Sequence, residues 1–129
     1  MKAGDNFSRV FVVDEPVYSG FIQTFHDTNP LHTNDEFARS MGFKSKVMHG
    51  NILNGFISYF IGECLPQKNV FILTQEISYS NPVYIGDQLN FSATITEVHE
   101  SVNVTDIKYK FSKTDGTKVA FGKIKIGLR

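Results

Sequence analysis

The spacing of hydrophobic residues changes once along the chain, near Pro66. Between Gly50 and Cys64 the apolar residues fall on one side of a 3.6-residue period, which is typical of an α-helix with a buried face. From residue 70 onward they alternate with polar residues, which is the period of a half-buried β-strand. The pattern predicts one long helix over 50–64, ended by Pro66, and a series of strands after it.

Four strands are expected after this helix, over residues 70–79, 88–96, 107–111 and 117–126. In the first of them Phe71, Leu73, Ile77 and Tyr79 are expected on one side of the strand. The dipeptide Asp115-Gly116 between the last two is typical of a tight hairpin turn. Short connections of this kind favour antiparallel pairing, so we expect an antiparallel sheet that curls around the apolar helix.

The start of the chain predicts a strand and then a helix. Residues 7–13 are rich in β-branched and aromatic side chains, which favours a strand. Asp14 is a good N-cap residue and Pro16 is tolerated in a first helical turn, so a helix is expected over about residues 15–25.

A second, shorter helix is expected after a turn-rich segment. Asn34 can cap a helix that Gly42 closes, which leaves residues 26–33 as a loop between two helices. With 129 residues the chain has the length of one ordinary domain. The expectation is a single α+β domain over residues 1–129, with a helical insert after the first strand.

Charge and composition exclude several classes of partner. Thirteen basic residues balance thirteen acidic ones without any basic cluster, so a nucleic-acid partner is not expected. No apolar stretch is long enough to cross a bilayer and the N-terminus lacks the pattern of a signal peptide, so no membrane partner is expected. Cys64 is the only cysteine, which excludes an intrachain disulfide and suits the cytoplasm.

The densest group of chemically active side chains lies in residues 26–32. Asp27 and His32 are five positions apart across Asn29-Pro30, a turn that can bring the carboxylate and the imidazole to one water molecule. The carboxylate would be the base and the imidazolium the acid. On residue types alone a structural reading is also open, in which Asp27 caps the turn and His32 fills a polar gap.

A metal site is the other chemical reading of this segment. His26, Asp27, His32 and His49 together supply the residue types of a two-histidine, one-carboxylate site. The sequence argues against it, because no two histidines have helical spacing and the neighbours His26 and Asp27 would point apart in an extended segment. Neither a metal nor another cofactor is therefore expected.

His49 and Gly50 stand directly before the predicted long helix. The free N–H groups and the positive dipole end of a helix can bind a developing oxyanion, and Gly50 would allow close approach. His49 is expected beside the substrate, although it can also pack beneath the loop. Further along, residues 79–87 form a strand connection whose role is expected to be structural, although it can also line a ligand channel.

The two sides of the predicted helix suggest an acyl pocket and a second subunit. Phe56, Tyr59 and Phe60 are candidates for the walls of a pocket. The opposite side carries Gly55, Ser58 and Gly62, and glycine is costly inside a helix unless a neighbouring backbone or ligand comes close. Since one helix cannot cover a whole curled sheet, we expect a homodimer or a higher homo-oligomer.

The segment 25–32 is followed by further groups of residues that together carry a family resemblance. In chain order the groups are Phe25-His26-Asp27-Thr28-Asn29-Pro30-Leu31-His32, Ala38, Gly42-Phe43, His49-Gly50, Pro82-Val83 and Gly86-Asp87-Gln88-Leu89. They resemble the MaoC-like hydratases of the hot-dog fold over about residues 20–95. The resemblance implies a hot-dog dimer that performs (R)-specific hydration of trans-2-enoyl-CoA, or the reverse dehydration of (R)-3-hydroxyacyl-CoA.

The resemblance also implies a role for individual residues. Asp27 and His32 match the catalytic pair of the family, the Gly50 amide matches the group that binds the thioester carbonyl, and Asn29 matches an amide that shapes the site. Two positions depart from the family. The residue before the aspartate is often Gly and is His26 here, and some members have Ser where this chain has Gly55.

Three alternatives concern the same fold. Hot-dog acyl-CoA thioesterases resemble chains with an acidic residue early in the central helix, where this chain has Asn51 and Asn54. A non-catalytic acyl-CoA binding subunit would not need Asp27 and His32. The substrate thioester can belong to CoA or to an acyl-carrier protein. The residues that contact CoA phosphates stay unassigned among candidates that include Arg39, Lys44 and Lys46.

Overall fold

The computed structural model describes all 129 residues of the chain. Five strands, four α-helices and two short helical turns follow one another along it. They are β1 (Asn6–Val12), α1 (Glu15–Phe25), α2 (Pro30–Thr33), α3 (Asp35–Ser40), α4 (Asn51–Tyr59), the π-helical turn η1 (Phe60–Cys64), β2 (Val70–Tyr79), β3 (Gln88–His99), the 3-10 turn η2 (Glu100–Val102), β4 (Val104–Lys113) and β5 (Lys118–Leu128).

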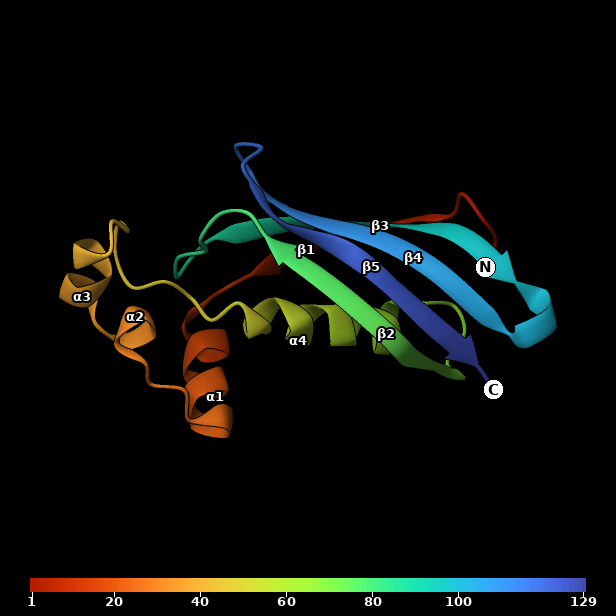
Figure 1. The fold of residues 1–129 in the computed structure, drawn as a ribbon, viewed down its shortest axis with the longest axis horizontal. Coiled ribbons are helices and arrows are strands. Elements are labelled where there is room, and N and C mark those ends of the chain that lie inside the picture. Colours follow the sequence, from red (N-terminus) through yellow and green to blue (C-terminus); the bar gives the residue numbers. More distant parts are fainter.

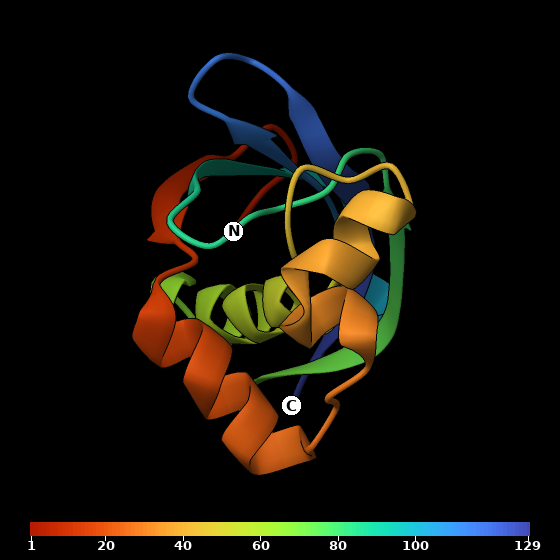
Figure 2. The same ribbon diagram turned by 90° about the vertical axis from the view of Figure 1, so that its left-hand side faces the viewer.

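The five strands form one antiparallel sheet in the order β1-β3-β4-β5-β2. The sheet curves over α4, and α1, α2 and α3 gather beyond one end of it (Figure 1). Seen from that end, these three helices lie in front of the start of α4 (Figure 2). The prediction of an antiparallel sheet around one central helix, with a helical insert after the first strand, is confirmed.

The core lies between the concave face of the sheet and α4. Alternate residues of the strands point inward, as the two-residue period predicts, and meet the apolar stripe of the helix. Burying each side chain of this size contributes about 1.5–3 kcal/mol. The largest fully buried side chains include Phe60, Phe91, Phe111, Ile57, Leu89, Ile95, Ile107, Ile124 and Ile126.

The central helix differs from its prediction in its last turn. The α-helix ends at Tyr59 and continues as the π-helical turn η1 over Phe60–Cys64. A π-helix rotates less per residue than an α-helix, so the neighbours Phe60 and Ile61 can both face the core, where both are buried. The extended backbone of Leu65, which precedes a proline, ends the element as predicted.

Strand β2 departs from a regular period at Leu73. Ile72 lies opposite Ile126 but Thr74 lies opposite Lys125, so the register shifts by one residue between them. Such a bulge moves the following side chains to the other face. The prediction that Phe71 and Leu73 share one side with Ile77 and Tyr79 is therefore wrong, because a regular alternation cannot reveal a bulge.

The two glycines on the small-residue side of the central helix have open space where a side chain would lie. A Cβ atom added at Gly55 or Gly62 would meet no other atom within 4 Å. The close approach that the sequence predicts for these glycines is thus not made by another part of the same chain. None of the helices combines the length and the apolar character that a membrane-crossing segment requires.

Candidate active site

The segment between α1 and α3 is shaped by its own side chains. Asp27 Oδ1 accepts a hydrogen bond from the Asn29 N–H at 3.2 Å, and Asn29 Oδ1 accepts one from the Leu31 N–H at 2.9 Å. Asn29 thus caps α2, with Pro30 in its first turn. The predicted loop over 26–33 is in part wrong, since Pro30–Thr33 form a helical turn that carries His32.

His26 ends α1 in a left-handed conformation, with φ 61° and ψ 23°. Its N–H donates to the carbonyl oxygen of Ile22, as expected at a helix C-terminus. The position before the aspartate therefore favours glycine, because glycine adopts a positive φ more readily than other residues. The His26 side chain is exposed and is not part of the cluster formed by Asp27, His32 and His49.

We expect His26→Gly to raise the free energy of unfolding by about 0.5–1 kcal/mol, because glycine adopts the left-handed region without the cost that a Cβ atom brings there. Urea denaturation would measure the change. Asn103→Gly is a matched control, since Asn103 also has a positive φ, of 53°, but asparagine tolerates this region better. An equal gain in both variants would contradict the explanation.

His32 is fixed through its ring and through its backbone. The ring Nδ1 lies 2.7 Å from the carbonyl oxygen of Val47, and the Tyr18 hydroxyl donates to the His32 carbonyl oxygen at 2.7 Å. A carbonyl can only accept, so the proton of the neutral ring is on Nδ1. The Nε2 lone pair is then directed to the other side, where it faces Asp27.

Asp27 and His32 are close enough to share one water molecule. Asp27 Oδ2 lies 3.8 Å from His32 Nε2, which is longer than a direct hydrogen bond. One water can contact both atoms at ordinary hydrogen-bond length. The Asp27 side chain is half exposed, whereas that of His32 is largely buried. The geometry suits a carboxylate and an imidazole that act together on a water.

His49 contacts both Asp27 and His32. Its Nε2 lies 2.8 Å from the carbonyl oxygen of Asp27, and its ring stacks on the ring of His32 with centroids 4.0 Å apart. The sequence predicts His49 beside the substrate. In the structure its ring Nε2 faces the backbone of Asp27, and the residue is buried although it also lines a cavity.

The same three side chains are of the residue types that bind metal ions. One ligand atom from each of Asp27, His32 and His49 can lie within 4.8 Å of the others. An imidazole binds a metal in its own ring plane, but these two ring planes are stacked, at only 29° to each other. Their lone pairs do not converge at the centre of the cluster, so the arrangement does not fit a metal site.

Gly50 precedes the first residue of α4 and contributes an N–H group that has no acceptor within the chain. A Cβ atom at this position would lie 2.9 Å from Cε1 of Tyr79. The N–H group and the helix dipole both favour negative charge here. The Gly50 N–H is therefore free to donate to a ligand, and its use as a donor to an oxyanion stays a prediction.

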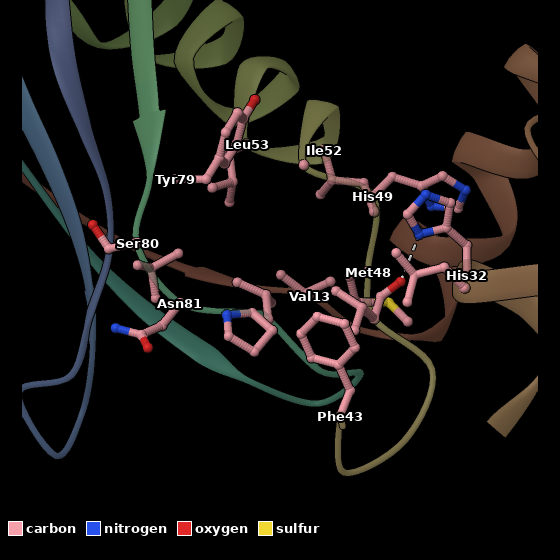
Figure 3. A pocket seen from close by; sticks show the side chains of 16 residues that line it. Val13, His32, Phe43, Met48, His49, Ile52, Leu53, Tyr79, Ser80 and Asn81 are labelled. Carbon is pink, nitrogen blue, oxygen red and sulfur yellow. Dashed lines mark hydrogen bonds between the residues drawn. The ribbon is translucent and has the colours of Figure 1, made fainter. Parts of the chain in front are cut away.

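Two cavities meet at the candidate catalytic pair. A cavity of about 350 Å³ includes His32, His49 and Gly50 in its wall, and one of about 740 Å³ includes Asp27; both contact Ile52. Figure 3 shows the smaller cavity, with His32 and His49 at one end and Tyr79 and Ser80 at the other. Its wall also includes Ser80, Asn81, Pro82 and Val83, so this connection is part of a cavity and not only a link between strands.

Only one of the three predicted acyl-pocket residues lies in the wall of these cavities. Phe56 lines the larger one together with Phe21 and Phe25. Tyr59 is exposed and lines neither cavity. Phe60 is completely buried against Phe91, with ring centroids 4.9 Å apart, and is part of the core. Helical spacing alone does not distinguish the core side of α4 from the cavity side.

A group of amides occupies the first turns of α4, where thioesterases of this fold carry an acid. The Asn54 side chain donates to Asn51 Oδ1 at 2.7 Å and accepts from Gln75 of β2. Asn54 also donates to the Tyr79 hydroxyl. Burial raises the pKa of Tyr79 above its usual value, and the hydrogen bond from Asn54 offsets part of this effect. No carboxylate takes part in this group.

Sequence reasoning missed two of the contacts that hold the pair. Tyr18 looks like an ordinary apolar residue of α1, yet it is buried and its hydroxyl binds the backbone of His32. The carbonyl oxygen of Val47 fixes the His32 ring. A buried tyrosine hydroxyl needs a partner, which is a weak signal, but a backbone carbonyl is present at every residue and gives none.

The fold and this site together define a hot-dog protein with a carboxylate and an imidazole beside the N-terminus of its central helix. The predicted hot-dog α+β class is confirmed by solved structures that share the whole fold. Residues 13–118 match the family model described as MaoC like domain. The chain belongs to the MaoC-like dehydratase family.

Individual relatives agree with this assignment. The chain is 32% identical over 96 residues to an (R)-specific enoyl-CoA hydratase of Rhodospirillum rubrum. The aligned residues make up 74% of this chain and 67% of the relative. It is 26% identical over 110 residues to an (R)-specific enoyl-CoA hydratase of Aeromonas caviae, with 85% and 82% covered. The solved (R)-hydratase from A. caviae superimposes with a TM-score of 0.90 at 23% identity and covers 100% of this chain and 98% of that one.

Proposed function

We propose that the protein catalyses the (R)-specific hydration of trans-2-enoyl-CoA to (R)-3-hydroxyacyl-CoA, or the reverse dehydration. The observation that carries the proposal is the 3.8 Å separation of Asp27 Oδ2 and His32 Nε2 beside the unpaired N–H of Gly50. The relatives named (R)-specific enoyl-CoA hydratase support the reaction. The protein is thus a hydro-lyase that acts on thioesters.

The proposed mechanism uses one water molecule between Asp27 and His32. The water donates hydrogen bonds to the Asp27 carboxylate and to the Nε2 lone pair of His32. As its hydroxyl group adds to C3 of the enoyl chain, Asp27 accepts its proton, and the same proton is then delivered to C2, so that both side chains return to their starting state. The elements of one water are thereby added across the double bond. The Gly50 N–H binds the thioester oxygen and stabilises the negative charge that develops on it.

The cavities suggest where the thioester lies. The larger one begins at Asp27 and has Phe21, Phe25 and Phe56 in its wall, which suits an acyl chain. Phe56 is therefore proposed as an acyl-pocket residue, while Tyr59 and Phe60 are not. The carrier of the acyl group is CoA or an acyl-carrier protein, because relatives with both kinds of substrate in their names share the family.

We also propose that the chain acts as a homodimer. Phe71, Ile72 and Leu73 are exposed on β2, an edge strand of the sheet, and the small-residue side of α4 is open. An edge strand with exposed apolar residues favours pairing with another chain. Other proteins of this fold form assemblies, as in the ChsH1-ChsH2 complex from Mycobacterium tuberculosis.

An assay with crotonyl-CoA tests the function. We expect the enoyl absorbance to fall without release of free CoA thiol, and chiral analysis should identify the product as (R)-3-hydroxybutyryl-CoA. Release of CoA thiol at the rate at which the enoyl absorbance falls would instead identify a thioesterase. Binding of crotonyl-CoA without either reaction would identify a non-catalytic acyl-CoA binding subunit.

A further inference from the structure

His49 is the most buried titratable group next to the candidate catalytic pair, and the proposed mechanism does not use it. The residue is 3% exposed and stands directly before Gly50 at the start of α4. The groups around its ring come from three parts of the chain. They are Asp27 before α2, His32 within α2, and Tyr18 and Phe21 of α1.

The hydrogen bonds determine which nitrogen of His49 carries its proton. Nε2 lies 2.8 Å from the carbonyl oxygen of Asp27, which can only accept, so Nε2 must be the donor. Nδ1 is buried and has no hydrogen-bond partner. A proton on Nδ1 would be left without an acceptor, so the neutral ring protonated at Nε2 is favoured.

The ring of His49 also supports the ring of His32. One side of it lies against Phe21, with centroids 4.6 Å apart, and His32 stacks on it at 4.0 Å. His32 is bound at Nδ1 by the Val47 carbonyl oxygen, so the stack and this hydrogen bond fix both the tilt and the rotation of its ring. His49 thereby contacts both members of the catalytic pair, one through its backbone and the other through its ring.

We propose that His49 is a positioning residue that sets the distance between Asp27 and His32, with its Nε2–H holding the Asp27 backbone and its ring holding the imidazole of His32. This inference rests on the proposed function. Catalysis by an acid and a base depends on their placement to a fraction of an ångström, and the groups behind them supply that placement. His49 itself does not touch the reacting atoms.

Two substitutions separate the hydrogen bond from simple packing. His49→Phe keeps a planar ring for the stack but removes the donor, whereas His49→Gln places an amide N–H near the position of Nε2. We expect His49→Phe to lower kcat for crotonyl-CoA about 10- to 100-fold with KM changed less than about twofold. His49→Gln should recover most of this loss. Equal losses in both variants, or no loss in His49→Phe, would overturn the proposal.

A spectroscopic measurement tests the same assignment without activity. Long-range proton–nitrogen NMR spectra of the wild-type protein should show His49 protonated at Nε2 and His32 at Nδ1, so that the two rings are opposite tautomers. The reverse tautomer at His49 would overturn the proposal. If these tautomers are found but crotonyl-CoA is not hydrated, the hydrogen bonds of His49 are supported and the proposed function fails. Failure of the proposed function can thus be distinguished from failure of the positioning proposal.

Discussion

Asp27→Asn is expected to lower kcat for enoyl-CoA hydration roughly 10³-fold, the loss typical of a general base. The amide keeps the size of the carboxylate and can still accept from the Asn29 N–H, the contact that Asp27 Oδ1 makes at 3.2 Å. The backbone carbonyl that binds His49 is unchanged. The variant should therefore fold and bind the thioester normally while losing the group that takes a proton from water.

The measurement is the initial rate with crotonyl-CoA over a range of substrate concentrations, together with calorimetric binding of a saturated acyl-CoA. Glu36→Gln is a matched control, because it also turns an exposed carboxylate into an amide, in the neighbouring helix α3, and makes no side-chain hydrogen bond or ion pair. We expect this control to keep full activity. An Asp27→Asn variant as active as Glu36→Gln would rule out Asp27 as the base.

Gly122→Ala is expected to lower the free energy of unfolding by about 3 kcal/mol, or to prevent folding, because the new methyl group has no space. Gly122 lies in β5 opposite Ile77 of β2. A Cβ atom there would overlap the backbone carbonyl oxygen of Glu76 and come within 2.6 Å of the Tyr109 hydroxyl. A backbone atom of a sheet cannot move aside without breaking the ladder.

The hydrogen bond beside Gly122 adds to the cost. The Tyr109 hydroxyl donates to the Glu76 carbonyl oxygen at 2.7 Å, and burial raises the pKa of Tyr109 to about 12. Since the folded pKa exceeds the unfolded value near 10, the contribution of Tyr109 to stability is complete below pH 10 and is lost as the pH rises toward and through 12. A displaced Glu76 would lose this contact as well.

Urea denaturation of the wild type and both variants would test the prediction. Gly20→Ala is the control, since a Cβ atom at Gly20 of α1 meets nothing within 4 Å. That variant should gain up to about 1 kcal/mol, as alanine does over glycine inside a helix. Equal stability of Gly122→Ala and the wild type would show that β2 and β5 can separate more easily than their register suggests.

Much of the fold could be predicted from the sequence because its elements have local causes. The residue types Asp115-Gly116 predict a turn, and Gly116 has the positive φ of 89° that this turn requires. The bulge at Leu73 could not be predicted, since Val70-Phe71-Ile72-Leu73 is a run of four apolar residues in which polarity does not distinguish one face of the strand from the other. The order of the strands is also not local, because β2 pairs with β5 rather than with β3.

Composition and spacing by themselves determined an α+β chain with one apolar helix, an Asp-Asn-Pro-His segment and a glycine before the helix. The tertiary structure decided what these residues do to one another. It brought the carbonyl oxygens of Asp27 and Val47 to the rings of His49 and His32, and so fixed both tautomers and the 3.8 Å separation of the pair. Backbone carbonyls are the same at every residue, so only the folded chain reveals which of them become partners.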